Sequence, residues 1–192
     1  MRKVIVNEFL TLDGVAQAPG GPDEDTSSGF AHGGWHLAYG AEDGVLPLIT
    51  GAGAFLLGRW TYELFADYWP SAPEAVGEFS EPMNTKPKYV ASRTLTDPLA
   101  WQNSSVLPSP LPEAVAALKE EDGGDLLVIG STLLVHSLLQ HGLVDELRLM
   151  IDPVLVGGGK RLFPDDGALR PLRLVDHEVT STGTIIATYA PA

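Results

Sequence analysis

The sequence predicts an α/β fold with a mostly parallel sheet and an antiparallel edge at its C-terminus. Short apolar runs alternate with helix-like segments from residue 54 to residue 140, an order typical of parallel βαβ units. Near the end, two strand-like runs flank the turn at 181–183, which predicts an antiparallel pair. With 192 residues, 44% of them hydrophobic, and no recognisable linker, the chain is expected to form a single domain over 1–192.

The N-terminal quarter predicts a strand followed by a long loop. Residues 3–10 alternate apolar and polar side chains, as a half-buried strand does. The segment from 13 to 34 is rich in Gly, Pro, Asp and Ser, and loops of this length are usually functional lids or disordered. We therefore expect either a lid or substrate wall there, or a disordered segment. A helix is expected over 35–48, although Gly40 and Gly44 weaken it.

The rest of the chain predicts alternating elements. Apolar runs indicate the strands, and Pro or Gly residues mark several helix ends. In order, we expect a strand over 54–57, a helix from Thr61 to Trp69-Pro70, loop or short helix over 73–82, strands over 88–91 and 101–107, a helix over 112–121, a strand over 125–129, a helix from Ser131 or Thr132 to Gln140, and strands over 146–153, 172–177 and 184–189.

Composition excludes several classes of function. The net charge of −13 argues against a general nucleic-acid or anionic-membrane surface, because phosphate backbones require clustered Lys and Arg. The absence of cysteine excludes disulfides, zinc–thiolate sites and a cysteine nucleophile. The N-terminus lacks a signal-peptide pattern, and no apolar run is long enough to span a membrane, so we expect a cytoplasmic protein.

Three predicted strands end in a small residue followed by a polar group or a helix start. These strand ends are Gly58-Arg59-Trp60-Thr61, Ala91-Ser92-Arg93 and Gly130-Ser131-Thr132. In open α/β sheets ligands bind beyond the carboxyl ends of the strands, where helix N-termini attract phosphate. Two of these ends add an arginine, which can bind a phosphate with two hydrogen bonds.

Simpler roles compete with an anion site. Arg59 lies four residues before Glu63 and Arg93 four before Asp97, so each can form an ordinary surface pair. On the residues alone, the two interpretations are even. The run Gly157-Gly158-Gly159 before Lys160-Arg161 either cradles a phosphate or forms a flexible turn, and composition favours the turn.

The histidines do not predict a metal site. His32 and His36 have the four-residue spacing of helical ligands, but Gly33 and Gly34 between them break a helix. His136 and His141 are better explained by packing or by a helix C-terminus.

The motifs together resemble a known family. The segments GRWTYE, VASRTL and VIGS, in this order, are similar to the dihydrofolate reductase fold. The segments TLDG at 11–14 and PVLVGGGKRLF at 153–163 bring the chain closer to the C-terminal reductase domain of the bifunctional riboflavin-biosynthesis deaminase–reductase and its stand-alone relatives. The resemblance spans nearly the whole chain and implies a three-layer α/β/α fold around a mixed, mostly parallel sheet.

The resemblance also implies an NADPH-dependent reductase, commonly a homodimer, that acts on a small heterocycle such as 5-amino-6-(5-phosphoribosylamino)uracil or dihydrofolate. A nucleotide-binding protein without turnover is the alternative. The resemblance implies that Gly58, Arg59 and Thr61 bind the cofactor phosphates and that Ser92 and Arg93 bind the 2′-phosphate. Val15 and Ala16, in the loop that starts at Asp13, are expected to close over the nicotinamide. The residues expected to bind the pyrophosphate and the ribose are Gly130, Ser131, Thr132, Leu133 and Leu134.

Substrate-side roles follow from the same resemblance. Glu42 or Asp43 falls near the position of the acidic group that protonates or orients a substrate, although both also fit a solvated helix face. The substrate is expected to meet Trp35, Tyr62, Lys160 and Arg161, the last two holding a phosphate. Where dihydrofolate reductases carry Gly-Gly at the late helix start, this chain has Gly130-Ser131. Aromatic residues expected at an interface or in the core are Trp60, Trp69 and Trp101.

Overall fold

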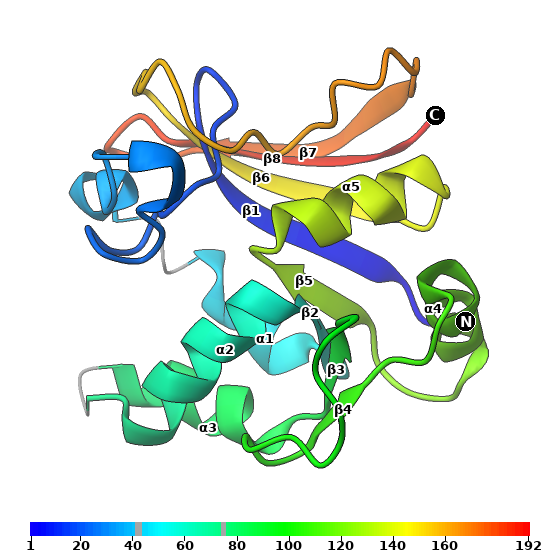
Figure 1. Cartoon of the computed structure of the whole chain (residues 1–192). Helices are drawn as coiled ribbons and strands as arrows, with labels where there is room; N and C mark the ends of the chain where they lie inside the picture. Colours follow the sequence, from blue (N-terminus) through cyan, green and yellow to red (C-terminus); the bar gives the residue numbers. More distant parts are fainter. Residues whose placement is uncertain (41–43, 74–75) are drawn as a thin grey trace.

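A computed structural model describes residues 1–40, 44–73 and 76–192, and over these the chain forms one sheet with helices on both faces (Figure 1). The strands are β1 (Val4–Thr11), β2 (Ala54–Gly58), β3 (Lys88–Ala91), β4 (Ser104–Val106), β5 (Leu126–Ile129), β6 (Glu146–Asp152), β7 (Leu172–Val179) and β8 (Ile185–Pro191). The helices are α1 (Leu46–Gly51), α2 (Arg59–Tyr68), α3 (Gly77–Thr85), α4 (Leu111–Glu120) and α5 (Thr132–Gln140), with short 3-10 turns that include η2 (Trp35–Ala38).

The sheet has the predicted mixture of parallel and antiparallel strands. Its order is β4-β3-β2-β5-β1-β6-β8-β7. The pairs from β4 to β6 are parallel, and β8 pairs antiparallel with both β6 and β7. The predicted fold class is therefore confirmed, including its antiparallel C-terminal edge.

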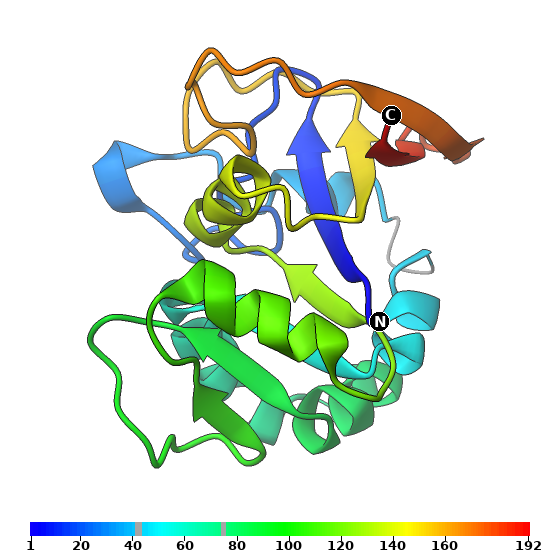
Figure 2. The same cartoon turned by 90° about the vertical axis from the view of Figure 1, so that its right-hand side faces the viewer.

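Two apolar clusters hold the layers together. On one face, α4 and α5 bury Val115 and Leu138 against β1, β2 and β5, and Figure 2 shows these helices over the strands. On the other face, α1, α2 and α3 contribute Ile49, Tyr62 and Met83 to a second cluster. Each fully buried side chain of this size contributes about 1.5–3 kcal/mol, so both layers are strongly fixed to the sheet.

One predicted helix differs from the structure. The expected helix over 35–48 is replaced by η2 and by α1, which begins only at Leu46. Gly34 and Gly40 adopt positive φ angles of 78° and 55°, which end the helical conformation on both sides of η2. Residues 41–43 lie outside the described part of the chain.

The sheet opens where β1 and β5 separate. β5 pairs with β1 from Val4 to Asn7 and ends at Ile129, whereas β1 continues to Thr11 beside β6. On the β5 side, the β1 backbone from Glu8 onward therefore has no neighbouring strand.

The described helices are all too short or too polar to cross a membrane.

Candidate functional site

A cavity of about 1540 Å³ lies at the carboxyl ends of β2, β3 and β5, beside the opening between β1 and β5. Its strand-end side is formed by residues 58–61, 91–94 and 130–134. Its apolar side includes Phe9, Val45, Ile49, Phe65, Phe79 and Met83. The volume exceeds the range of about 300–1,000 Å³ typical of single small-molecule pockets. The cavity is thus large enough for two ligands side by side.

Two helices begin at the strand-end side of this cavity. α2 starts at Arg59 directly after β2, and α5 starts at Thr132 after β5. Neither first turn is capped by the side chain of its N-cap residue, Gly58 or Ser131. The backbone N–H groups of both first turns and the positive ends of both helix dipoles are therefore available to an anion in the cavity.

Ser131 connects the two strand ends. Its hydroxyl accepts a hydrogen bond from the Gly58 N–H at 2.8 Å and donates one to Thr61 Oγ1 at 2.9 Å. Ser131 occupies the N-cap position of α5, as one of the two expected helix starts, but its side chain does not cap the helix because it bonds across to α2 instead. Ser131 also has a left-handed backbone, with φ 67°, directly after Gly130 with φ 63°. Gly130 and Ser131 thus both have the left-handed backbone that glycine adopts without strain.

Replacing Ser131 with alanine is expected to lower the free energy of unfolding by about 1–3 kcal/mol, because two hydrogen bonds are lost and the left-handed backbone stays strained. Replacement with glycine should cost about 1 kcal/mol less, since glycine adopts that backbone freely. Urea unfolding of the two variants measures this difference. Equal losses would show that the backbone strain at Ser131 has no energetic effect.

The two predicted anion-binding arginines both line the cavity but differ in their contacts. Arg59 Nη1 lies 3.0 Å from Glu63 Oε2, in a pair whose side chains are 48% and 41% exposed. The simpler role considered for Arg59 is therefore present, and such a pair contributes little stability. Arg93 is exposed and forms no ion pair among the described residues, and Asp97 instead accepts a hydrogen bond from the Val106 N–H. Arg93 is therefore free to meet an anion.

The predicted loop over 13–34 is ordered against the Gly-rich segment near the C-terminus. Val15 forms an antiparallel bridge with Arg161, and Ala16 N–H donates to Lys160 O at 2.9 Å. The Gly157 N–H donates to Asp13 Oδ2 at 2.9 Å, and the hydrogen bond from the Thr11 hydroxyl, followed by such backbone bonds, lowers the pKa of Asp13. The glycine run is thus a turn that holds this loop, as composition favoured.

Lys160 and Arg161, which are predicted to bind a phosphate of the substrate, already form contacts within the protein. Lys160 Nζ lies 2.5 Å from Asp25 Oδ2, and Arg161 donates to the Asp13 carbonyl. Both residues still line the cavity, with Lys160 5.8 Å above the Trp60 ring. A substrate phosphate would therefore compete with contacts inside the loop.

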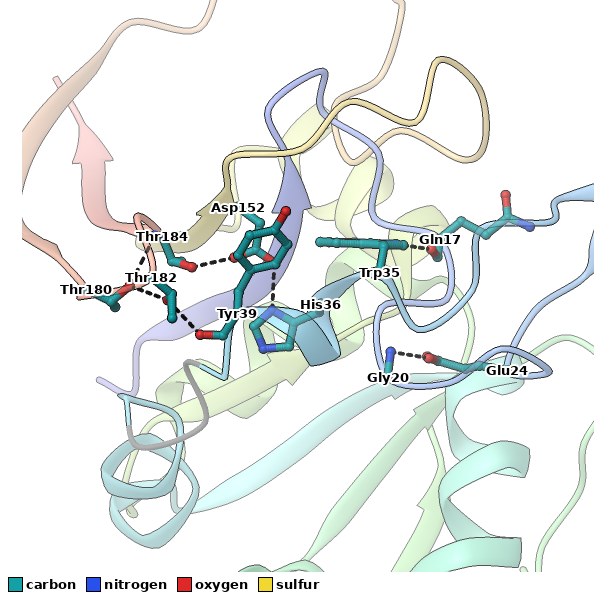
Figure 3. A network of polar contacts seen from close by, with 10 residues as sticks. All are labelled: Gln17, Gly20, Glu24, Trp35, His36, Tyr39, Asp152, Thr180, Thr182 and Thr184. Carbon is teal, nitrogen blue, oxygen red and sulfur yellow. Dashed lines mark hydrogen bonds and ion pairs between the residues drawn. The ribbon is translucent and has the colours of Figure 1, made fainter.

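Several predicted residues do not line the cavity. Trp35 is buried and donates its indole N–H to Gln17 O at 2.8 Å (Figure 3). Tyr62 is buried, and its hydroxyl accepts a hydrogen bond from the backbone N–H of Trp101. Val15 is also buried, whereas its neighbour Ala16 lines the cavity. Trp35, Tyr62 and Val15 are therefore packing residues and do not line the cavity.

The predicted catalytic acids Glu42 and Asp43 lie outside the described residues, so their positions stay predictions. Among the other residues predicted for the site, Ser92 and the whole run 130–134 line the cavity together with Gly58 and Thr61.

Glu8 is a cavity residue that the sequence reasoning missed. It lies on β1, is 4% exposed, and its Oε1 has no hydrogen-bond partner among the described residues. Burial, followed by the charge of Glu24, raises the pKa of Glu8 well above its ordinary value. The pKa of Glu24 is raised as well, mainly by burial. Glu8 shares a strand face with the buried residues Val6 and Leu10, so a carboxyl group on an apolar face was the available signal.

Replacing Glu8 with glutamine is expected to remove part of the pH dependence of stability. Above the ordinary pKa of a glutamate, the folded state keeps a proton that the unfolded chain releases, so stability falls as pH rises toward the folded pKa. Glutamine is neutral throughout and should flatten that slope. Urea unfolding at several pH values checks this, with Glu178→Gln on the exposed strand β7 as control. Parallel plots of the free energy of unfolding against pH for wild type and Glu8→Gln would contradict the raised pKa of Glu8.

Comparison with known proteins agrees with this architecture. An uncharacterised protein of Bacillus subtilis (strain 168), YyaP, is 28% identical over 193 residues, covering 98% of this chain and 94% of the relative. A Thermotoga maritima protein titled diaminohydroxyphosphoribosylaminopyrimidine deaminase/5-amino-6-(5-phosphoribosylamino)uracil reductase has a similar fold, with a TM-score of 0.66 and 15% identity over all of this chain and 57% of its own.

A dihydrofolate reductase from Enterococcus faecalis, solved in complex with NADP(H) and RAB-propyl, also has a similar fold. Its TM-score is 0.62 at 15% identity, covering 98% of this chain and 96% of the enzyme. The model of the family described as the RibD C-terminal domain matches residues 2–186. The resemblance seen in the motifs is confirmed by that match, and the chain belongs to the RibD C-terminal domain family.

Proposed function

We propose that this protein is an NADPH-dependent reductase that transfers a hydride to a small heterocyclic substrate. Membership of a reductase-domain family supports an oxidoreductase. The observation that carries the proposal is the junction at Ser131, which places the uncapped starts of α2 and α5 at one cavity that Arg59 and Arg93 also line. This arrangement offers backbone N–H groups and two cations to the phosphates of a dinucleotide.

The residues present fit NADPH. Gly58 and Gly130 leave no room for a larger side chain, because a Cβ at Gly58 would lie 3.2 Å from the Ser131 side chain and one at Gly130 would lie 3.2 Å from Thr61 Oγ1. In the proposed complex, the starts of α2 and α5 hold the phosphates and Arg93 holds the 2′-phosphate. NADPH, when bound, supplies the hydride.

The protein's own contribution is orientation, exclusion of water and control of a proton. Residues 16–25 of the 13–34 loop line the cavity, and the Lys160–Asp25 pair helps to hold them there. Burial raises the pKa of Glu8 and so favours its protonated form, which can donate a hydrogen bond to a polar edge of a ring in the cavity. Apolar side chains such as Ile49, Phe65 and Phe79 can hold the faces of a flat heterocycle.

The class of substrate is indicated by the part of the cavity that these apolar side chains and Glu8 line. A pyrimidine or pterin ring matches an apolar cavity wall with a few polar groups, and the reductase activity named for the similar Thermotoga maritima protein points to a ribosylated aminouracil. If the substrate carries a phosphate, Lys160 and Arg161 would bind it after releasing Asp25 and the Asp13 carbonyl.

The test is an NADPH oxidation assay with 5-amino-6-(5-phosphoribosylamino)uracil and, separately, dihydrofolate. Substrate-dependent loss of NADPH absorbance is expected with the first compound. Tight NADPH binding without oxidation by either compound would favour the alternative of a nucleotide-binding protein without turnover.

A homodimer and a cytoplasmic location are part of the same proposal. Of the aromatic residues considered for an interface, Trp101 is buried and Trp60 is 54% exposed. The edge strand β7 exposes further apolar residues, Leu174 and Val179 among them, which could pair two copies. Sedimentation equilibrium measures the mass directly, and a monomer would exclude the dimer.

A further inference from the structure

A buried chain of three polar side chains lies next to the cavity and has no part in the cofactor contacts proposed above. His36 Nδ1 lies 2.7 Å from Asp152 Oδ2, and the Thr184 hydroxyl donates to Asp152 Oδ1 at 2.6 Å (Figure 3). His36 comes from η2, Asp152 ends β6, and Thr184 directly precedes β8. His36 is 2% exposed, and Asp152 and Thr184 are fully buried.

The hydrogen bonds determine which ring nitrogen of His36 carries a proton. An ionised carboxylate only accepts hydrogen bonds, so Nδ1 must be the donor to Asp152. In neutral His36 the proton is therefore on Nδ1, and Nε2 has a free lone pair. When the ring is protonated, Nε2 becomes a donor, and the Asp152 carboxylate stabilises the positive charge.

Nε2 is the unexplained atom of this chain. It is buried and has no hydrogen-bond partner among the described residues, although His36 lines the cavity. The ring stacks on Phe9, with ring centroids 3.9 Å apart and planes inclined by 34°, so its position is fixed. In Figure 3, Nε2 lies on the side of the ring away from Asp152. A buried polar atom without a partner costs free energy, which a bound ligand would recover.

We propose that His36 is the proton donor to the substrate, with Asp152 and Thr184 as positioning residues. The inference rests on the proposed reductase function and names the source of its proton. As a C=N or C=O carbon accepts a hydride, its electron pair moves to the nitrogen or oxygen, which takes the proton from His36 Nε2. His36 is left neutral, with its remaining proton on Nδ1, and solvent protonates it again before the next turnover.

A structural role is the competing explanation. The chain of hydrogen bonds also ties η2 to the sheet, and Thr182 adds a bond to Tyr39 O at 2.7 Å. A tether of this kind needs Nδ1 and Asp152 but makes no use of Nε2. The two explanations therefore differ in what happens at Nε2 and in how turnover responds to pH.

Other titratable groups can also produce a pH dependence and must be separated from His36. On the elements around the ring these are Asp152 and Arg148 on β6, Glu8 on β1, Tyr39 after η2, and Glu24 and Asp25 on the 13–34 loop. Because only the protonated ring of His36 can donate a proton from Nε2, turnover should fall as pH rises. Glu8 acting as the acid would give a fall in the same direction, so Glu8→Gln is included in the test.

The first arm of the test measures turnover with NADPH and 5-amino-6-(5-phosphoribosylamino)uracil. His36→Gln and Asp152→Asn are expected to lower kcat about 100-fold or more, the lower end of proton-transfer contributions, with NADPH affinity unchanged. His32→Gln, at an exposed histidine, is the matched control. Glu8→Gln should keep the fall at high pH, and His36→Gln should lose it. If turnover no longer decreases at high pH in Glu8→Gln but still decreases in His36→Gln, the proposal is overturned.

The second arm needs no turnover and uses the full-length protein with ¹⁵N-labelled histidine. Its NMR spectra should show neutral His36 protonated on Nδ1 in the wild type and on Nε2 in Asp152→Asn. Adding the aminouracil in the presence of NADP⁺ should shift the His36 Nε2 resonance. An unshifted Nε2 resonance overturns the proposal whether or not turnover is seen. A shift in a protein that does not oxidise NADPH keeps the contact and refutes the reductase function instead.

Discussion

Arg93→Ala is expected to weaken NADPH binding by about 1.5–3 kcal/mol, the usual contribution of hydrogen bonds to charged groups, and to leave NADH binding nearly unchanged. Arg93 follows β3 at the cavity, is exposed, and has no ion-pair partner among the described residues. Its guanidinium is therefore available to the 2′-phosphate that distinguishes the two nucleotides. Fluorescence titration of the variant with each nucleotide measures both affinities.

Arg59→Ala should also weaken NADPH binding, by an amount toward the lower end of that range. Its guanidinium is shared with Glu63, and part of any phosphate contact must replace that pair. The matched control is Arg173→Ala, at an exposed arginine on β7 outside the cavity lining. An equal loss of NADPH and NADH affinity in Arg93→Ala would place Arg93 away from the 2′-phosphate.

Lys88 should make the protein more stable as pH rises from about 8 to 10.5. Its ammonium group is fully buried, donates to three backbone carbonyls, and lies 4.3 Å from the centroid of the Trp101 ring. Burial lowers the pKa of Lys88 from 10.5 to about 8. Between these pH values the unfolded chain binds a proton that the folded chain has released, so the free energy of unfolding increases with pH.

The expected size of the Lys88 effect is about 3 kcal/mol, since each unit of pKa difference corresponds to about 1.4 kcal/mol. Urea unfolding across this pH range measures it, and Lys88→Met should lack that part of the slope. Lys3→Met, at a lysine that is 59% exposed, is the control for general alkaline effects. An unchanged slope in Lys88→Met would mean that Lys88 titrates normally in the fold.

The fold was predictable because its signals are local. The apolar strand over 125–129, the helix start after it and the closing antiparallel pair each follow from neighbouring residues, and all are present. The expected helix over 35–48 failed at Gly40, one of the two glycines that had weakened it, which adopts a positive φ angle. The strand-end motifs were predictable for the same reason, since each lies within a few residues of a strand.

The rest of the site depends on contacts between distant parts of the chain. His36 and Asp152 are 116 residues apart, Lys160 and Asp25 are 135 apart, and Ser131 reaches Gly58 across 73 residues. Periodicity and capping rules describe only near neighbours, so they assigned Ser131 to its own helix. The same rules could not pair His36 with a carboxylate.

The measurement that most directly tests the cofactor site is a fluorescence titration of the wild-type protein with NADPH and with NADH. A site built from two helix starts and a free Arg93 should bind NADPH well below millimolar concentration and clearly more tightly than NADH. Absence of binding by both nucleotides at millimolar concentration would contradict it, and the fold would then serve another ligand.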